Sequence, residues 1–183
     1  MAEYHLTAPL TEEDVTKLKL GDTVYIRGKC FTCRSRLQKH IFDEKNVLPF
    51  ETDDRNVLIH NGPIVIKENG KWKLRMIIGK TTMGKETAKM MKEKKCVHAS
   101  PRSISPNLWI DSIEVEDVYL YDELSKIEAA WFFNLKDLGP FIVDIDTEGN
   151  NYFDRLDEDI ATRKNQALKK LGIDENYQFT KLY

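Results

Sequence analysis

The sequence is most informative over residues 138–151, which read LGPFIVDIDTEGNN. Gly139-Pro140 introduces the apolar run Phe141–Ile145, which is typical of a strand buried on at least one face. Gly149-Asn150-Asn151 then predicts a turn. Beyond the turn, apolar residues recur at the spacing of one helix face. They are Leu156, Ile160, Ala167, Leu168 and Leu171. We therefore expect a folded domain over residues 1–153 and a helical extension over 154–183, packed on the same domain.

Upstream of this stretch, short helical and strand patterns alternate. Thr11 to Asp14 reads as the capped start of a short helix that ends near Gly21, a residue suited to a left-handed closing conformation. Two further helices are expected, at Arg34–Glu44 and Thr87–Lys95. Strands are expected at Thr23–Arg27, Val57–His60, Ile64–Ile66, Trp72–Ile78, Val115–Tyr121 and Trp131–Leu135, with a hairpin turn at Glu68–Lys71. The order predicts a single α/β domain followed by a C-terminal helix.

The composition of the chain limits the classes of function that it can have. A length of 183 residues fits one domain, and the 41% hydrophobic fraction is ordinary for a globular protein. The net charge of -2 gives no overall attraction to nucleic acid or to an anionic membrane. Residues 1–14 lack a basic region followed by an apolar run, so no secretory signal is expected, and no apolar run approaches membrane-spanning length. A cytoplasmic protein is the expectation.

The three cysteines, Cys30, Cys33 and Cys96, do not suit a disulfide framework because their number is odd. Cys30 and Cys33 have C-x-x-C spacing, which raises the alternatives of a zinc site or a thioredoxin-like redox site. A structural zinc site needs about four ligands, and no second such pair exists. Ordinary half-buried cysteines are therefore the favoured interpretation, with no metal bound by this chain alone.

Five segments, taken in order, resemble one known family. They are residues 6–34 with LTAPL, LGDTVYIRG and FTCR, residues 60–65 with HNGPIV, residues 79–82 with GKTT, residues 128–131 with EAAW, and residues 138–151. Together they resemble the β subunit of L-tartrate dehydratase, which is equivalent to the C-terminal domain of class I fumarase. These segments cover most of residues 5–153.

The resemblance implies a fold, a partner and a reaction. It implies a swivelling β/β/α domain that closes over the active site of an iron–sulfur hydro-lyase, which adds or removes water on a small hydroxy or unsaturated dicarboxylate. It also implies that a 4Fe–4S cluster sits on a partner α subunit, where the open iron acts as a Lewis acid on the substrate. This chain itself is then expected to bind no cluster.

The resemblance also implies the site residues. Arg34 matches an arginine that clamps a substrate carboxylate, and Thr81 and Thr82 match a threonine pair that contacts substrate. The first of that pair, Thr81, matches a proposed catalytic base. Lys85 stands where the family has a second clamping arginine, and offers one point charge in place of a bidentate fork.

The chain departs from the family pattern at several of these motifs. Ser35 replaces an aspartate, Gln38 falls where a histidine is expected, and Lys80 replaces the proline before the threonine pair. The family's lysine-bearing loop is deleted in this chain, and Lys89, Lys92, Lys94 and Lys95 stay open as substitutes for its lysine. Two hypotheses follow: an active subunit, or a catalytically inactive paralogue that keeps the fold as a binding or assembly module. A homodimer is open under either hypothesis.

Several of the candidate site residues also have a purely structural interpretation. Arg34 could form only a surface ion pair, and Thr81-Thr82 could be a polar turn after a buried strand. His60 is interpreted as anchoring a turn, and the lysines of residues 85–95 as a solvated helix face. Asp144 and Asp146 could suggest a metal site, but we favour a capped strand end.

Overall fold

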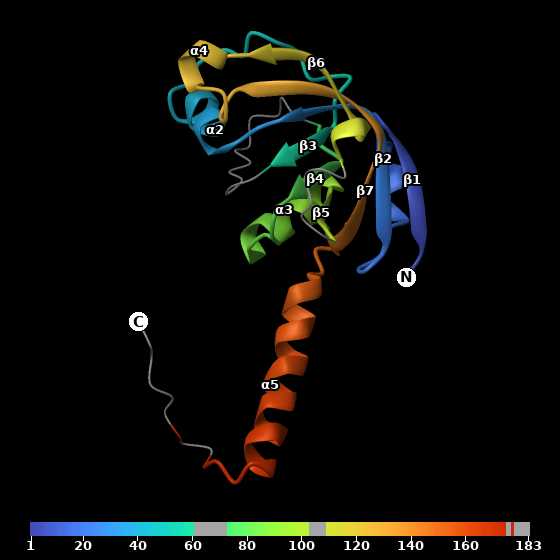
Figure 1. Ribbon diagram of the computed structural model, residues 1–183, viewed down its shortest axis with the longest axis vertical. Coiled ribbons are helices and arrows are strands. Elements are labelled where there is room, and N and C mark those ends of the chain that lie inside the picture. Colours follow the sequence, from blue (N-terminus) through green and yellow to red (C-terminus); the bar gives the residue numbers. More distant parts are fainter. Residues whose placement is uncertain (61–72, 103–108, 175–176, 178–183) are drawn as a thin grey trace. The chain divides into compact units, whose positions relative to one another are not determined.

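The computed structural model describes residues 1–60, 73–102, 109–174 and 177. The chain divides into two compact units, residues 1–151 and 152–183. The first is a mixed α/β unit, and the second contains the helix α5, at Tyr152–Lys170 (Figure 1). The predicted α/β class and the C-terminal helix are confirmed. The predicted packing of that helix on the first unit stays a prediction.

The first unit is built on a sheet that closes on itself. The strands are β1 Glu3–Ala8, β2 Thr23–Thr32, β3 Val57–His60, β4 Met76–Gly79, β5 Val97–Pro101, β6 Ile113–Tyr119 and β7 Ala130–Ile145. They pair in the order β1-β2-β3-β4-β5-β7-β6, and β7 also pairs with β2. Strands β2, β3, β4, β5 and β7 therefore form a closed ring, with β1 beside β2 and β6 beside β7. From β1 to β5 each pairing is parallel, whereas β7 is antiparallel to its neighbours.

Side chains alternate between two hydrophobic clusters. In β4, Met76 and Ile78 join the cluster that also contains residues of β1, β2 and β7, while Ile77 joins the cluster on the opposite face. Helices α2 (Ser35–Phe42), α3 (Lys85–Lys94) and α4 (Tyr121–Leu124) contribute to that second cluster. Because both faces are covered, every residue of β4 is buried, as is typical of parallel strands.

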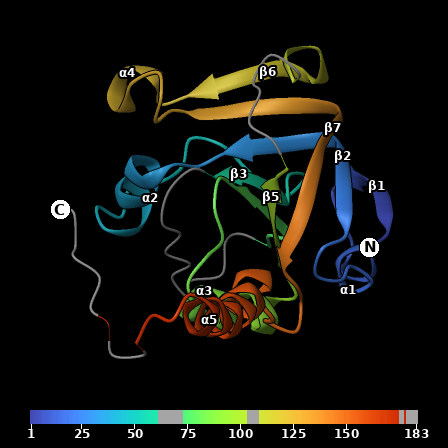
Figure 2. The same ribbon diagram turned by 60° about the horizontal axis from the view of Figure 1, so that its bottom comes forward.

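Strand β7 corrects the prediction of two separate strands around Gly139-Pro140. The strand continues through this pair, with its first part beside β6 and its second part beside β5 (Figure 2). Opposite β2, Leu138 pairs with Ile26 and Phe141 with Val24, so β7 has one extra residue there. This β-bulge accommodates Pro140, which has no N–H to donate to a regular ladder.

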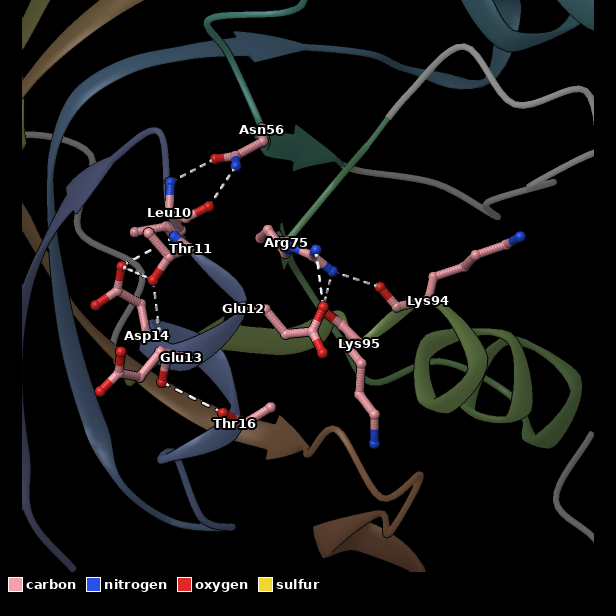
Figure 3. Close-up of polar contacts among 10 residues, drawn as sticks. All are labelled: Leu10, Thr11, Glu12, Glu13, Asp14, Thr16, Asn56, Arg75, Lys94 and Lys95. Atoms are coloured by element: carbon pink, nitrogen blue, oxygen red, sulfur yellow. Dashed lines mark hydrogen bonds and ion pairs between the residues drawn. The ribbon is translucent and has the colours of Figure 1, made fainter.

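Two side chains tie the first helix, α1 (Glu12–Thr16), to strands β3 and β4 and to helix α3 (Figure 3). Asn56 accepts from the backbone N of Leu10 at 2.7 Å and donates to its O at 2.6 Å. The Arg75 guanidinium donates to the carbonyl of Lys94 at 2.8 Å and contacts Glu12 at 3.1 Å. Arg75 thereby satisfies a carbonyl at the C-terminus of α3, which an isolated helix would leave unpaired.

Local sequence signals predicted α1 well at its start and less well at its end. Thr11 accepts from the Asp14 backbone N at 3.1 Å and Asp14 accepts from the Thr11 backbone N at 2.9 Å, which confirms the capping box. The helix ends at Thr16, earlier than predicted, and Gly21 has the expected left-handed conformation with φ of 86°. The predicted strand Ile64–Ile66 and the turn at 68–71 lie outside the described residues.

We expect Thr11→Ala to lower the free energy of unfolding by about 1 kcal/mol, because it removes the hydroxyl that caps α1. Urea unfolding measures the change. Thr11→Ser is the matched control, since it keeps the hydroxyl and should retain most of the stability. Equal stability of the alanine and serine variants would contradict this role of Thr11.

In the described part of the chain, no helix is both long and apolar enough to cross a membrane.

Candidate functional site

The predicted site residues follow the carboxyl ends of two parallel strands. Arg34 follows β2, and Thr81, Thr82 and Lys85 follow β4, with β3 between these strands. Parallel neighbours end at the same edge of a sheet, so the loops that carry these residues start from one edge. In open α/β sheets that edge is the usual place for a ligand. The structure thus brings the predicted residues to a common edge.

Arg34 is the N-cap residue of α2 and is held by Glu128. Its Nε lies 3.5 Å from Glu128 Oε1, and Glu128 Oε2 accepts from the backbone N of Arg36 at 3.0 Å. Glu128 therefore caps α2 while it orients Arg34. Among the described residues, the two Nη atoms of Arg34 have no hydrogen-bonding partner. The half-buried guanidinium can thus still bind an anion.

The loop after β4 offers one free hydroxyl and one that is engaged. Thr81 is exposed, and no described residue bonds its hydroxyl. Thr82 Oγ1 donates to Asn151 Oδ1 at 3.2 Å, and Asn151 Nδ2 donates to the backbone O of Met83 at 3.1 Å. Asn151 therefore fixes the end of this loop.

Lys85 is the exposed first residue of α3, and no described residue pairs with it. Among the described residues, no side chain caps this helix start, and no atom lies within 4 Å of a Cβ atom added to the N-cap residue Gly84. A free N-terminal turn and an adjacent ammonium group both favour a negative charge. Lys89 and Lys92 of the same helix are exposed, in keeping with a solvated lysine face.

His60 ends β3 and anchors it to the neighbouring strand end. Its Nδ1 donates to the backbone carbonyl of Cys33, and Gln38 Nε2 lies 3.2 Å from the same nitrogen. Burial lowers the pKa of His60, so the ring is neutral near pH 7. His60 thus anchors the end of β3 to the segment after β2, where Gln38 is also buried. The turn that His60 is predicted to anchor, at residues 61–63, lies outside the described residues.

Because the folded protein holds His60 neutral, we expect its stability to fall as the pH drops. The unfolded chain takes up a proton near the ordinary pKa of 6.5, and the folded chain takes it up only at lower pH. Stability linked to His60 is therefore fully present above pH 6.5 and is lost as the pH falls toward the folded pKa. Urea unfolding across this range, compared with His60→Gln, measures the effect. An unchanged pH dependence in that variant would contradict it.

Sequence reasoning missed a buried polar cluster between β5 and β7. His98 Nδ1 donates to Asp144 Oδ1, and Ser100 Oγ donates to Asp144 Oδ2 at 2.6 Å. The expected capped strand end is confirmed for Asp146, which accepts from the backbone N of Glu148 and Asn150 at 3.0 Å each. The expectation of a capped strand end is wrong for Asp144, which accepts a hydrogen bond from His98 instead. The available signal was a charged residue inside the apolar run of residues 141–145.

The cysteines correct the expectation of half-buried side chains, because all three are fully buried. Burial raises the pKa of each thiol, for Cys96 to about 12. Cys30 lies in one hydrophobic cluster, whereas Cys33 and Cys96 lie in the other. The thiols are therefore protonated and do not converge. In the described ranges, no group of three or more histidine, cysteine or acidic side chains is placed to hold a metal ion.

We expect all three thiols of the folded chain to resist a disulfide reagent at pH 8, since thiolates are the reactive species. Unfolding in urea should make all three react quickly. A timed absorbance assay on native and unfolded chain measures this difference. Rapid reaction of one thiol in the native chain would contradict its burial.

Known proteins resemble this chain over nearly its whole length. The L(+)-tartrate dehydratase subunit beta of Escherichia coli is 26% identical over 191 residues, which cover 91% of this chain and 94% of that protein. A Methanocaldococcus jannaschii protein, provisionally named as the same subunit, is 28% identical, with 87% of this chain and 95% of that protein covered. A Geobacillus stearothermophilus protein, provisionally named fumarate hydratase class I, is 31% identical over 91% of this chain and 35% of its own length. No protein-family model matches the chain.

These comparisons confirm the resemblance drawn from the sequence segments. The chain is similar over most of its length to L(+)-tartrate dehydratase β subunits and to part of a protein provisionally named fumarate hydratase class I. In extent it corresponds to the β subunits, because it spans nearly all of their length and about a third of the fumarate hydratase.

Proposed function

We propose that this chain is the small subunit of an iron–sulfur hydro-lyase that adds or removes water on a small hydroxy or unsaturated dicarboxylate. The observation that carries the proposal is the common strand edge from which Arg34, Thr81 and Lys85 project, in a chain that matches a β subunit over 91% of its length. Two cationic groups and a free hydroxyl suit a dianion with a reacting carbon between its carboxylates.

Each residue has a role in this proposal. Arg34 binds one carboxylate through its Nη atoms, since a guanidinium can pair with both oxygens at once. Lys85 and the uncapped start of α3 bind the second carboxylate. Thr81 then faces the reacting carbon and is proposed to take part in transferring the proton of its C–H bond. Holding the dianion at both ends fixes the carbon against Thr81, which lowers the entropic cost of reaching the transition state.

The 4Fe–4S cluster is proposed to belong to the α subunit, because the three cysteines of this chain do not suit it. The cysteines are buried in two separate clusters and their thiols stay protonated. When bound by the partner, the cluster supplies a Lewis acid for the substrate hydroxyl. The β subunit acts through charge, orientation and closure as a swivelling β/β/α domain of the fumarase C-terminal type.

Other parts of the proposal concern assembly. We propose a cytoplasmic complex with a cluster-bearing α subunit, with a homodimer of the chain as a further level of assembly. Residues 154–183 are proposed to pack on the domain of residues 1–153. Nucleic acid and membranes are not part of the proposed set of partners.

A second candidate is an inactive paralogue that keeps the fold as a binding or assembly module. It is favoured by two contacts of this structure. Gln38 is buried beside His60, and the Thr82 hydroxyl is engaged by Asn151. Both side chains are therefore less available to a substrate than the family pattern implies.

Anaerobic co-expression with the neighbouring genes tests the proposal. We expect a brown, iron-containing complex that turns over a four- or five-carbon hydroxy or unsaturated dicarboxylate. Turnover that is lost in Arg34→Ala would eliminate the inactive paralogue. A colourless chain that purifies alone, although a cluster-type α subunit is expressed with it, would overturn the hydro-lyase proposal.

A further inference from the structure

We propose that His98, held by Asp144, is a positioning residue for the loop of residues 79–83, which carries Thr81 and Thr82. This inference rests on the proposed function for the role of the threonines. It concerns the polar cluster of His98, Ser100 and Asp144, to which the proposed function assigns no role. His98 lies on β5, which pairs with β4 on one side and with β7 on the other.

A β-bulge turns Asp144 toward His98. Across the β5–β7 ladder, His98 pairs with Ile145 and Ala99 pairs with Val143, so Asp144 has no partner of its own. A bulge of this kind leaves one residue out of register and re-aims its side chain. Asp144 is 1% exposed, and its two carboxylate oxygens accept from His98 Nδ1 and Ser100 Oγ. The contact of His98 Nδ1 with a carboxylate oxygen of Asp144 fixes the orientation of the ring.

The fixed ring lies against the first residue of the loop. A Cβ atom added to Gly79 would lie 2.5 Å from His98 Nε2 and 3.2 Å from His98 Cε1. The imidazole therefore occupies the space that a side chain at residue 79 would need. The same added atom would lie 3.3 Å from Met83 Cε, at the other end of the loop. Only glycine allows the ring, the strand end and Met83 to approach this closely.

The segment that leads out of β7 holds the loop at its other end as well. Asn151, which bridges to Ile145, accepts from Thr82 and donates to the carbonyl of Met83. Asp144 holds the His98 ring against Gly79, and Asn151 forms hydrogen bonds with Thr82 and Met83 directly. Thr81 lies between these two supports, so its backbone position is set by residues 144–151 together with His98.

The position of His98 explains why a polar ring is used there. Its Nε2 is buried and has no hydrogen-bond partner among the described residues. An apolar side chain would avoid that unpaired atom, but it would lose the bond to Asp144 that orients the ring over Gly79. We therefore assign the imidazole to positioning; fully buried as it is, it does not touch the substrate.

Three variants test this assignment in the full-length chain. His98→Asn keeps a donor near the Nδ1 position and removes the atoms over Gly79. Gly79→Ala adds a methyl group where the ring lies. In the double variant, the added methyl takes the vacated space. His5→Asn is the matched control, since it makes the same change at an exposed histidine of β1.

We expect each single variant to shift the backbone amide NMR signals of Lys80, Thr81 and Thr82, and the double variant to move them back toward wild type. In the complex with the cluster-bearing subunit, each single variant should lower kcat by about 100-fold, the loss typical of a small misplacement. KM should change little, because Arg34 and Lys85 are untouched. The control variant, His5→Asn, should change neither these amide signals nor kcat. If Gly79→Ala fails to fold alone, recovery of folding in the double variant counts as the same compensation.

The inference is overturned if His98→Asn leaves the three amide signals in place, or if the double variant is no better than the worse single variant. A loss of thermal stability without movement of the loop signals would likewise reduce His98 to a packing role. If the wild-type complex has no activity, the proposed function fails. The NMR comparison in the free chain still decides the positioning of the loop.

Discussion

Replacing Arg34 with alanine is expected to lower kcat/KM for the dicarboxylate by a factor of about 30 to several thousand, equivalent to about 2–5 kcal/mol. Arg34 lies at this strand edge, where its Nη atoms have no hydrogen-bonding partner among the described residues and its Nε lies 3.5 Å from Glu128 Oε1. In the proposed site, removing it leaves one substrate carboxylate without a charged partner. Steady-state kinetics of the reconstituted complex measure the loss.

Two matched variants make the Arg34 result specific. Arg36→Ala removes an exposed arginine of the same helix, whose backbone N alone contacts Glu128, and should leave kcat/KM nearly unchanged. Arg34→Lys keeps the charge but loses the bidentate fork, so it should give an intermediate loss. Equal activity of Arg34→Ala and wild type would remove Arg34 from the site.

Phe141→Ala is expected to lower the free energy of unfolding by about 3–5 kcal/mol. Phe141 is 1% exposed, pairs with Val24 on β2 and with Pro101 on β5, and packs on the Trp109 ring at a centroid distance of 5.4 Å. It therefore fills the place where β7 joins both sides of the closed ring of strands. Its removal leaves a cavity at that junction, which the surrounding strands cannot fully close.

Urea unfolding of the whole chain measures the Phe141 effect. Val115→Ala is the control, because Val115 is 56% exposed on β6 and should change stability by less than about 0.5 kcal/mol. A Phe141→Ala variant as stable as the control would mean that β7 does not close the ring in solution.

Part of the candidate site was predictable from the sequence because its motifs are short. Thr81 and Thr82 closely follow a strand that its pattern predicts. Arg34 was marked by the order of the resembling segments, since the predicted strand Thr23–Arg27 ends well before it, whereas β2 extends to Thr32. The support for these residues was not predictable. Glu128 reaches Arg34 from the segment before β7, and Asn151 reaches Thr82 across 69 residues. Such pairings depend on which strands become neighbours, a property that no local pattern contains.

The sequence by itself determined the features that depend on residues a few positions apart. The capping box of Thr11 and Asp14, the bounds of β3 and the left-handed Gly21 are of this kind, since each is satisfied by its own neighbourhood. The tertiary structure alone decided that β7 runs unbroken through Pro140, that three cysteines are fully buried, and that His98 binds Asp144, 46 residues away. The physical reason is that a bulge, a buried thiol and a buried carboxylate are stabilised by partners from distant strands, which meet only when the ring of strands closes.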